Sequence, residues 1–185
     1  MIWFISDSHF SHANILRLCN RPFVDVEEMD WTMIRYWNEV VGPEDYVYHL
    51  GDFTLGGYKI AEQVFNQLNG NIRVLGLPWH HDKRWLPKHA SHPISSRNGK
   101  TVEVLPPIVV LEFKEYGEGK HAKAVTLSHY PLAEWDRMYY GGWHLHGHTH
   151  GNYTTTQERI MDVGVDCVGF TPISIDEIAE RMNKP

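Results

Sequence analysis

The sequence has few cysteines, no long apolar run and no excess of positive charge, so it lacks the usual features of secreted, membrane and nucleic-acid-binding proteins. Its 185 residues include only two cysteines, too few for a disulfide framework, so we expect a cytoplasmic protein with two buried thiols, Cys19 and Cys167. No apolar run approaches the roughly 20 residues that cross a bilayer, and the opening MIWFISDSHF lacks the basic segment and cleavage site of a signal peptide. The formal net charge of −6 implies no broad electrostatic attraction to nucleic acid.

Histidine, in contrast, is abundant, and four of the 13 histidines fall in the stretch HLHGHTHG at 144–151. The stretch is internal and interrupted by other residues, which excludes a purification tag. Alternate residues of a strand share one face, so the pattern fits either a histidine-rich surface strand or a metal site. The near absence of cysteine favours nitrogen and oxygen ligands over a zinc-finger arrangement.

The first half of the chain alternates short apolar runs with helical patterns. Strands are predicted at 2–5, 46–50 and 72–75, and later at 124–127 and 143–145. The spacing of Trp31, Ile34, Trp37 and Val41 predicts a helix after an Asp25 cap, and a second helix is predicted over 58–68. From about residue 92, strands over 101–105, 108–114 and 121–127 are separated by turns such as Asn98-Gly99, which predicts hairpins. The pattern is that of a mixed α/β protein with two sheets and outer helices.

Residues suited to metal binding follow the end of strand after strand. In open α/β sheets, ligands gather beyond the carboxyl ends of the strands, so these residues are expected to converge. The set consists of Asp7, His9, Asp52, His80, His81, His129, His148 and His150. There are too many ligands for one tetrahedral ion, and carboxylates with imidazoles suit two divalent ions such as Mn, Fe, Zn, Ni or Co. Two such ions would clamp an in-line displacement at phosphorus.

Five segments carry a resemblance to a known family. They are SDSHFSHANILRLCNRPF, VYHLGDF, SHYPL, LHGHTHG and DVGVDCVGFTPISIDEI. In this order they resemble the calcineurin-like metallophosphoesterase superfamily, and above all its small single-domain bacterial and phage-borne branch. The resemblance covers the chain from residue 2 to about 178. It implies one domain over 1–185 with a four-layer α/β/β/α sandwich, in which two mixed sheets are flanked by helices.

The resemblance also implies a role for each ligand. In the family, the residues matching Asp7, His9 and His150 hold the first metal, and Asp52 matches the carboxylate shared by both metals. The second metal is held by the residues matching His129 and His148. His81 matches a histidine outside the metal shell, which hydrogen-bonds the phosphate or protonates the leaving group.

The chain departs from the family pattern Gly-Asn-His-Asp, because it reads Trp79-His80-His81-Asp82. Either His80 binds the second metal through a nitrogen where the family uses an amide oxygen, or it points away and the second site is weakened. A nitrogen ligand would shift the metal preference from Mn toward Zn, Ni or Fe. Trp79 is expected either to pack or to stack on a base.

Two residues after the first motif are weaker candidates for substrate binding. Arg21 is expected either to hold phosphate oxygens or to fix its loop, and His12 to lie near the substrate or behind the ligands. Of the remaining histidines, His144 and His146 are expected to be structural and His89 to be solvated. Asp82 is expected to cap a helix or to orient His81. Gly147 is expected to let the backbone leave the strand so that the rings of His148 and His150 diverge.

The resemblance implies a metal-dependent phosphoric ester hydrolase, in which a metal-bridging hydroxide attacks a phosphodiester. A nucleotide and a nucleic-acid end are the candidate substrates, and neither a membrane nor an obligate protein partner is implied. The alternatives are a phosphomonoesterase acting on a small metabolite and a non-catalytic scaffold that retains the fold. The segment GDFTLGG lacks the Asp-Arg of the family's protein phosphatases, which argues against that activity.

Overall fold

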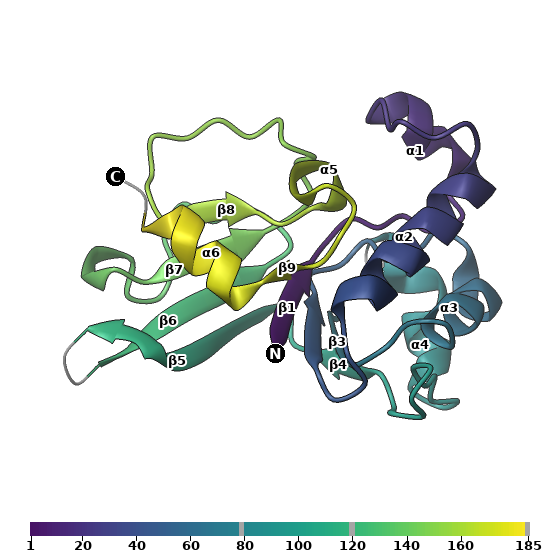
Figure 1. Cartoon of the computed structure of the whole chain (residues 1–185), viewed down its shortest axis with the longest axis horizontal. Helices are drawn as coiled ribbons and strands as arrows, with labels where there is room; N and C mark the ends of the chain where they lie inside the picture. Colours follow the sequence, from purple (N-terminus) through teal and green to yellow (C-terminus); the bar gives the residue numbers. More distant parts are fainter. Residues whose placement is uncertain (78–79, 119–120, 184–185) are drawn as a thin grey trace.

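The computed structural model describes residues 1–77, 80–118 and 121–183 and contains two packed β-sheets with helices around them (Figure 1). The first sheet has the order β4-β3-β2-β1-β9, formed by Glu103–Leu105, Asn71–Leu75, Tyr46–His49, Ile2–Ile5 and Ile173–Ser174. Its strands are parallel except for β9, which is antiparallel to β1. The central strands read IWFI and YVYH, the β-branched and aromatic composition of strands covered on both faces.

The second sheet has the order β5-β6-β7-β8, formed by Ile108–Glu118, His121–Ser128, Trp143–His146 and Ile160–Asp162. Strands β5 and β6 form an antiparallel hairpin, whereas β6, β7 and β8 run parallel. Both sheets are therefore mixed, and the predicted fold of two mixed sheets flanked by helices is confirmed.

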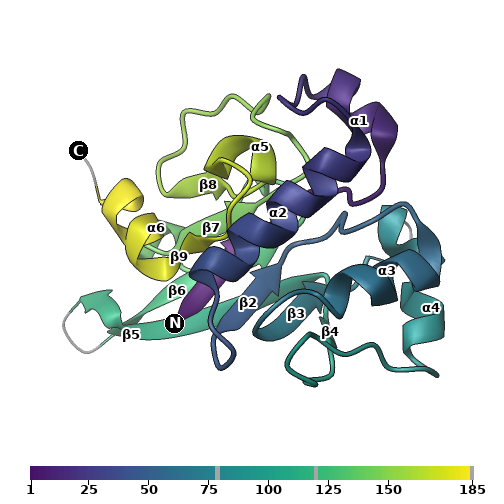
Figure 2. The same ribbon diagram turned by 45° about the vertical axis from the view of Figure 1, so that its right-hand side comes forward.

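Helices cover the face of the first sheet that points away from the second sheet. They are α1 (Ala13–Leu18), α2 (Val26–Val40), α3 (Gly57–Phe65) and α4 (Leu86–His89). Figure 2 shows α2 in front of this sheet, slanting across the picture in about the same direction as β2. Met33 and Trp37 of α2 and Phe65 of α3 pack against Val47 and Val74 of the sheet in one buried cluster. Burial of this size is the main favourable contribution to folding.

A second buried cluster lies between the two sheets. Phe4 and Tyr48 of the first sheet meet Val125 and Leu145 of the second. Ile178 of α6, Ile175–Met182, joins the same cluster, so this C-terminal helix closes the core beside β1 and β9. The short helix α5, Val165–Val168, precedes β9.

The start of α2 agrees with the prediction, and its buried face differs from it at one residue. The Asp25 side chain accepts a hydrogen bond from the Glu28 N–H at 2.8 Å, and the Glu28 carboxylate accepts one from the Val24 N–H at 2.6 Å. Trp31 was expected on the buried face and is 63% exposed, because Met29 and Met33 turn toward the sheet instead.

Two further expectations from the sequence are wrong, and one is confirmed only in part. Asn98-Gly99 lies in a tight turn closed by an antiparallel bridge between Ser95 and Thr101, but the strand that follows, β4, joins the first sheet parallel to β3. The second sheet contains one hairpin rather than several, since β7 and β8 are added in parallel. Cys19 and Cys167 are free thiols that are only partly buried. No helix in the described part of the chain is long and apolar enough to cross a membrane.

The topology brings the carboxyl ends of five parallel strands to one edge. Asp7 follows β1, Asp52 follows β2, His129 follows β6 and His148 follows β7, while His80 follows β3 after a longer connection. This shared edge is where the candidate ligands gather.

Candidate metal centre

The seven predicted ligands lie in two adjacent groups at this edge. Within each group, one donor atom per residue lies within 4.8 Å of the others. The first group is Asp7, His9 and His150, and the second is Asp52, His80, His129 and His148. His80 therefore does not point away from the other ligands.

The carboxylate of Asp52 stands between the two groups. Its Oδ2 atom lies 3.8 Å from His9 Nε2 and 3.5 Å from His129 Nε2, and its Oδ1 atom lies 2.9 Å from His80 Nδ1. The surrounding histidines hold the pKa of Asp52 below its usual range, because their hydrogen bonds and charges outweigh the opposing effect of burial. Asp52 is thus placed to serve both groups as a carboxylate.

Five of the seven candidate ligands have a left-handed backbone. The φ angles are 57° for Asp7, 52° for His9, 54° for Asp52, 68° for His148 and 47° for His150. This conformation costs roughly 1–3 kcal/mol per non-glycine residue and persists where the surrounding structure enforces it. Its concentration here indicates that the loops are shaped for the site.

Backbone pairing between the loops enforces this geometry. The N–H of Asp7 donates to the Gly51 carbonyl at 3.1 Å, and the N–H of His9 donates to the Asp52 carbonyl at 3.0 Å. The N–H of His148 donates to Asp7 Oδ2 at 2.8 Å, which joins the second sheet to the first.

Gly147 allows the end of β7 to approach the first loop closely. A Cβ atom at this position would lie 2.6 Å from Ser6 Cβ and would overlap the Asp7 carboxylate. β7 ends at His146, so the backbone does leave the strand at Gly147, but its φ is not in the left-handed region and does not itself require glycine. Glycine is required here because there is no space for a side chain.

Several donor atoms of the groups are buried without a partner, which tests whether the residues fit a metal. They are Asp7 Oδ1, both ring nitrogens of His9, and His129 Nε2. Each buried polar atom without a partner costs about 1–3 kcal/mol. Burial raises the pKa of Asp7 to about 6 and, as the main cause, holds the pKa of His9 well below its usual range. A buried neutral imidazole and a buried carboxylate, both with donor atoms that have no protein partner, can be coordinated by a divalent cation.

The outer nitrogens of three candidate ligands have partners that orient the rings. His129 Nδ1 donates to the Leu50 carbonyl at 3.1 Å, leaving Nε2 directed at Asp52. His150 Nδ1 contacts the Asp166 carboxylate at 2.7 Å, and His80 Nε2 contacts the Tyr130 hydroxyl. Partners of this kind select the tautomer and hold the ring in place for a metal.

His81 and His12 lie beside the first group. The ring centroid of His81 is 5.1 Å from that of His9, and its Nε2 is 3.9 Å from Asp52 Oδ2. The His81 side chain is 39% exposed, and burial is the main cause that lowers its pKa. The His12 ring lies 5.5 Å from His9 and 5.9 Å from His81. His81 therefore reaches both the ligands and solvent.

Arg21 does not have the position expected of a substrate ligand. Its guanidinium is buried and donates to both Asp166 oxygens at 2.9 Å, to the Asp7 and Ser8 carbonyls, and to Met29 Sδ. All of its N–H groups point at the protein, so none is available for phosphate oxygens. The alternative expectation, that Arg21 fixes the loop, is the one the structure supports.

Asp166 and Tyr130 were missed in the sequence. Both lie in segments that carried the resemblance, DVGVDCVG and SHYPL, and Tyr130 directly follows a candidate ligand. Histidine ligands of a metal usually bond to an acidic residue that orients the ring, so an unassigned acidic residue in these segments is a candidate for that role. The sequence does not indicate which histidine such a residue contacts.

His144, His146 and Asp82 bond to the protein backbone. His144 Nδ1 contacts the Thr126 carbonyl, His146 Nδ1 contacts the Gly147 carbonyl, and both rings are buried as expected. Asp82 was expected to cap a helix or orient His81, but its carboxylate accepts hydrogen bonds from the backbone of 53–54 and so braces the loop after Asp52.

His89 was expected in solvent, yet it is buried and bonded to Val102 and Ile94. Trp79 lies outside the described residues, so its expected packing or stacking is not addressed by the structure.

Fold and site together define an α/β sandwich protein with a histidine- and aspartate-rich candidate metal centre at the carboxyl edge of its strands. No known family model matches the chain. It is 33% identical to the uncharacterized protein MJ1445 of Methanocaldococcus jannaschii, over 99% of this chain and 92% of that protein. It is 30% identical to the gene 66 protein of Mycobacterium phage L5, over 98% of this chain and 93% of that protein. The chain belongs to the family that contains these proteins.

A solved structure has a similar fold. The protein of unknown function AQ665 from Aquifex aeolicus superposes with a TM-score of 0.69 over 98% of both chains, at 23% identity. The likeness establishes that the two proteins share a fold.

Proposed function

We propose that the protein is a dinuclear metal-dependent phosphoesterase of the calcineurin-like superfamily and that its substrate is a phosphodiester. One observation carries the proposal: two donor groups flank the Asp52 carboxylate, and several of their buried donor atoms have no protein partner. Carboxylates and imidazoles without cysteine suit Mn, Fe, Zn or Ni.

Two divalent ions, when bound, supply positive charge that stabilises the phosphoryl transition state and lowers the pKa of the attacking water. Asp7, His9 and His150 would hold one ion, and His80, His129 and His148 the other. Asp52 would join them. The left-handed loops and the orienting hydrogen bonds keep these side chains fixed, so little reorganisation is needed before reaction.

His81 has the position of a proton donor in this proposal. It is partly exposed and lies beside Asp52, so it can reach a substrate from the open side of the site. It would hydrogen-bond the phosphate or protonate the leaving oxygen. His12, next to it, would line the same face of the substrate.

The proposal is tested by hydrolysis of a generic aryl phosphodiester after Mn, Ni or Zn is added to metal-stripped protein, with the monoester run alongside. Diester turnover supports the proposal, and faster turnover of the monoester moves the assignment to a phosphomonoesterase. Absence of turnover with every ion favours the scaffold. If Mn alone is retained, His80 has not shifted the metal preference toward Zn or Ni as a nitrogen ligand would.

The role of His81 has its own test. Replacing His81 with Ala is expected to lower turnover by roughly 10²–10⁴, the usual contribution of general acid catalysis, without changing metal content. His92→Ala, at an exposed histidine of another loop, is the matched control. Full turnover in His81→Ala would show that the proton donor is another group, and loss of metal would show that His81 is a ligand.

A further inference from the structure

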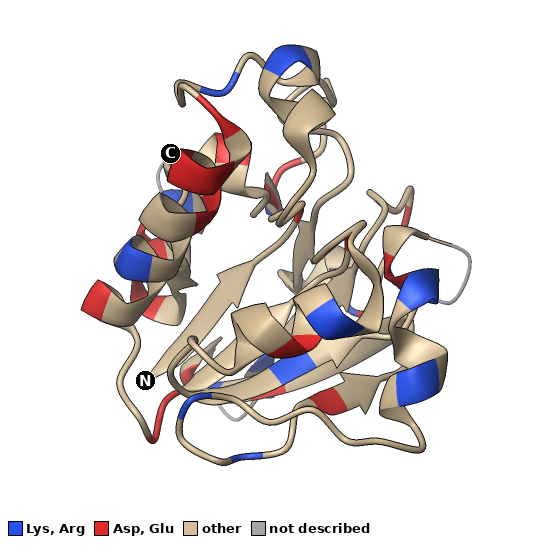
Figure 3. Cartoon of the chain, turned by 90° about the vertical axis from the view of Figure 1, so that its right-hand side faces the viewer, with Lys and Arg blue, Asp and Glu red and all other residues tan. Residues whose placement is uncertain are grey.

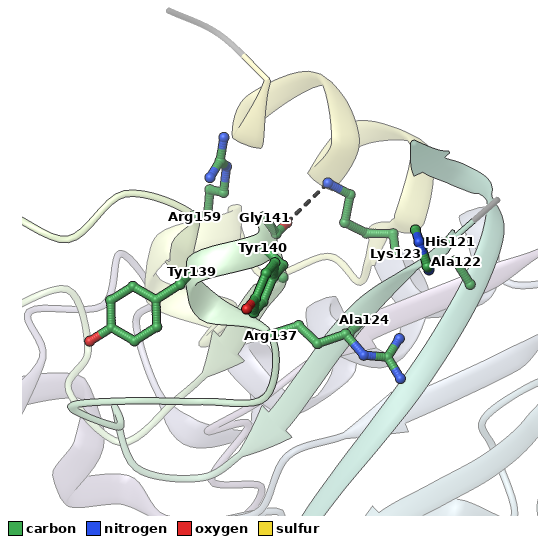
Figure 4. A pocket seen from close by; sticks show the side chains of 10 residues that line it. His121, Ala122, Lys123, Ala124, Arg137, Tyr139, Tyr140, Gly141 and Arg159 are labelled. Carbon is green, nitrogen blue, oxygen red and sulfur yellow. Dashed lines mark hydrogen bonds between the residues drawn. The ribbon is translucent and has the colours of Figure 1, made fainter. Parts of the chain in front are cut away.

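A second candidate site lies at the end of the second sheet opposite the metal centre. A pocket of about 800 Å³ is formed there by the start of β6, the turn η2, Met138–Tyr140, with the glycines after it, and Arg159 before β8 (Figure 4). Pockets of roughly 300–1,000 Å³ are typical of small-molecule sites. Ala124 lines the pocket and His129 follows the same strand, so the two sites are about 17 Å apart at the usual strand rise.

Positively charged groups converge in this pocket. A Cβ atom built on Gly141 would lie 3.4 Å from Lys123 Nζ and 3.9 Å from Arg159 Nη1, so both groups approach the same point. Lys123 is 8% exposed and donates to the Gly141 carbonyl at 3.0 Å, which fixes its ammonium group at the pocket floor. Arg159 is exposed and forms no ion pair within the described residues. Arginine binds phosphate through parallel hydrogen bonds.

This convergence is unusual for the molecule. The net charge is −6, and the helical side of the protein carries acidic and basic residues together (Figure 3). The charged residues that line the pocket are basic, and one of them, Arg137, is paired with Glu112 at 2.6 Å and with Asp136 at 3.4 Å. Arg159, which is exposed and has no such pair within the described residues, is therefore the guanidinium suited to an anion.

An exposed aromatic ring stands beside the converging cations. Tyr140 is 90% exposed, and Figure 4 shows its ring in the middle of the pocket, with Arg159 to one side and Lys123 to the other. The neighbouring Tyr139 is 78% exposed and hydrogen-bonds Glu134. An aromatic face beside Arg and Lys is the combination on which nucleic-acid bases stack.

We propose that this pocket binds a nucleoside 5′-phosphate, with the base on Tyr140 and the phosphate on the Arg159 guanidinium. The ligand is either a free nucleotide or the end of a single-stranded nucleic acid, since both present the same base and phosphate. An acidic peptide would use the cations and leave the Tyr140 face without a matched partner. The pocket shares no residue with the metal centre, so this binding does not depend on the proposed hydrolysis.

The test is calorimetric titration of the full chain with AMP, adenosine, inorganic phosphate, a 5′-phosphorylated tetradeoxyadenylate and a glutamate peptide. Each titration is made with and without a chelator. AMP is expected to bind in both conditions and more tightly than adenosine or phosphate alone. Tighter binding of the tetranucleotide assigns the pocket to nucleic-acid ends, and equal binding assigns it to free nucleotides. Both of these outcomes support the proposal.

Variants locate the binding. Tyr140→Ala is expected to weaken AMP binding roughly 5- to 150-fold, the usual effect of removing one base–aromatic stack. Arg159→Ala is expected to weaken phosphate-bearing ligands and leave adenosine unchanged. Trp31→Ala and Arg35→Ala, exposed residues of α2, are matched controls that should bind as the unaltered chain does.

The proposal is overturned by any of four results. They are no AMP binding, loss of AMP binding on chelation, unchanged affinity in both pocket variants, and a glutamate peptide that binds as tightly as AMP.

Discussion

The buried ion pair between Arg21 and Asp166 supports the candidate site, and breaking it is expected to lower the free energy of unfolding. The Arg21 side chain is 0% exposed and that of Asp166 is 10% exposed, with 2.9 Å between Nε and Oδ1. The other Asp166 oxygen contacts His150 at 2.7 Å and accepts a second bond from Arg21 at 2.9 Å. One carboxylate thus orients a candidate ligand and neutralises a buried cation.

Asp166→Asn removes the charge while keeping the size of the side chain. Removing one partner of a buried ion pair leaves an uncompensated charge and costs about 3–5 kcal/mol. Because small proteins have only about 5–15 kcal/mol of stability, the variant is expected to fold with a large loss of unfolding free energy. Loss of the partner that orients His150 is expected to weaken metal binding by roughly 10- to 100-fold.

The assay is chemical denaturation of metal-free protein, followed by metal titration under conditions in which the variant is folded. Glu39→Gln is the matched control, since it breaks the exposed Arg35–Glu39 pair, whose atoms are 3.4 Å apart. Exposed pairs of this spacing contribute about 0.5 kcal/mol or less. If Asp166→Asn loses no more stability than Glu39→Gln and binds metal normally, the structural role given to Asp166 is wrong.

Three other predictions concern single residues. Gly147→Ala is expected to lower stability by about 1–3 kcal/mol through overpacking and to displace Asp7; unchanged unfolding midpoint and metal content would contradict this. Tyr130→Phe removes the hydroxyl that contacts His80 and is expected to weaken one of two metal-binding steps about 10-fold, which titration of metal-free protein measures. Burial lowers the pKa of His144 from 6.5 to about 4, so the unfolded chain is protonated first and stability present above pH 6.5 is lost as pH falls toward 4. His144→Gln should remove about 2 kcal/mol of the difference in unfolding free energy between pH 7 and pH 5, and an unchanged difference would refute the assignment.

Elements with a local signal were predicted well from the sequence. The Asp25 cap and the helix after it, the strands at 2–5 and 143–145, and the two-sheet architecture all agree with the structure. Apolar periodicity and capping chemistry are local, so they can be read without knowing the rest of the fold. The parallel addition of β4 and β7 was not predicted, because strand direction depends on where the chain returns to the sheet.

The candidate ligands could be named from the sequence because each follows a short apolar run, and the carboxyl ends of parallel strands must meet. That argument needs only local patterns and one rule of sheet geometry. It extends to His80, whose position after β3 brought it toward the same edge despite the departure from the family pattern.

Only the tertiary structure decided which groups surround and orient these ligands. Arg21 and Asp166 are 145 residues apart in the chain and form one buried pair, while Tyr130 reaches His80 across 50 residues. Gly147 likewise is required only because Ser6, from a distant segment, packs against it. Such contacts depend on the packing of side chains from distant segments, and no local periodicity or spacing encodes which partner a buried polar group will find.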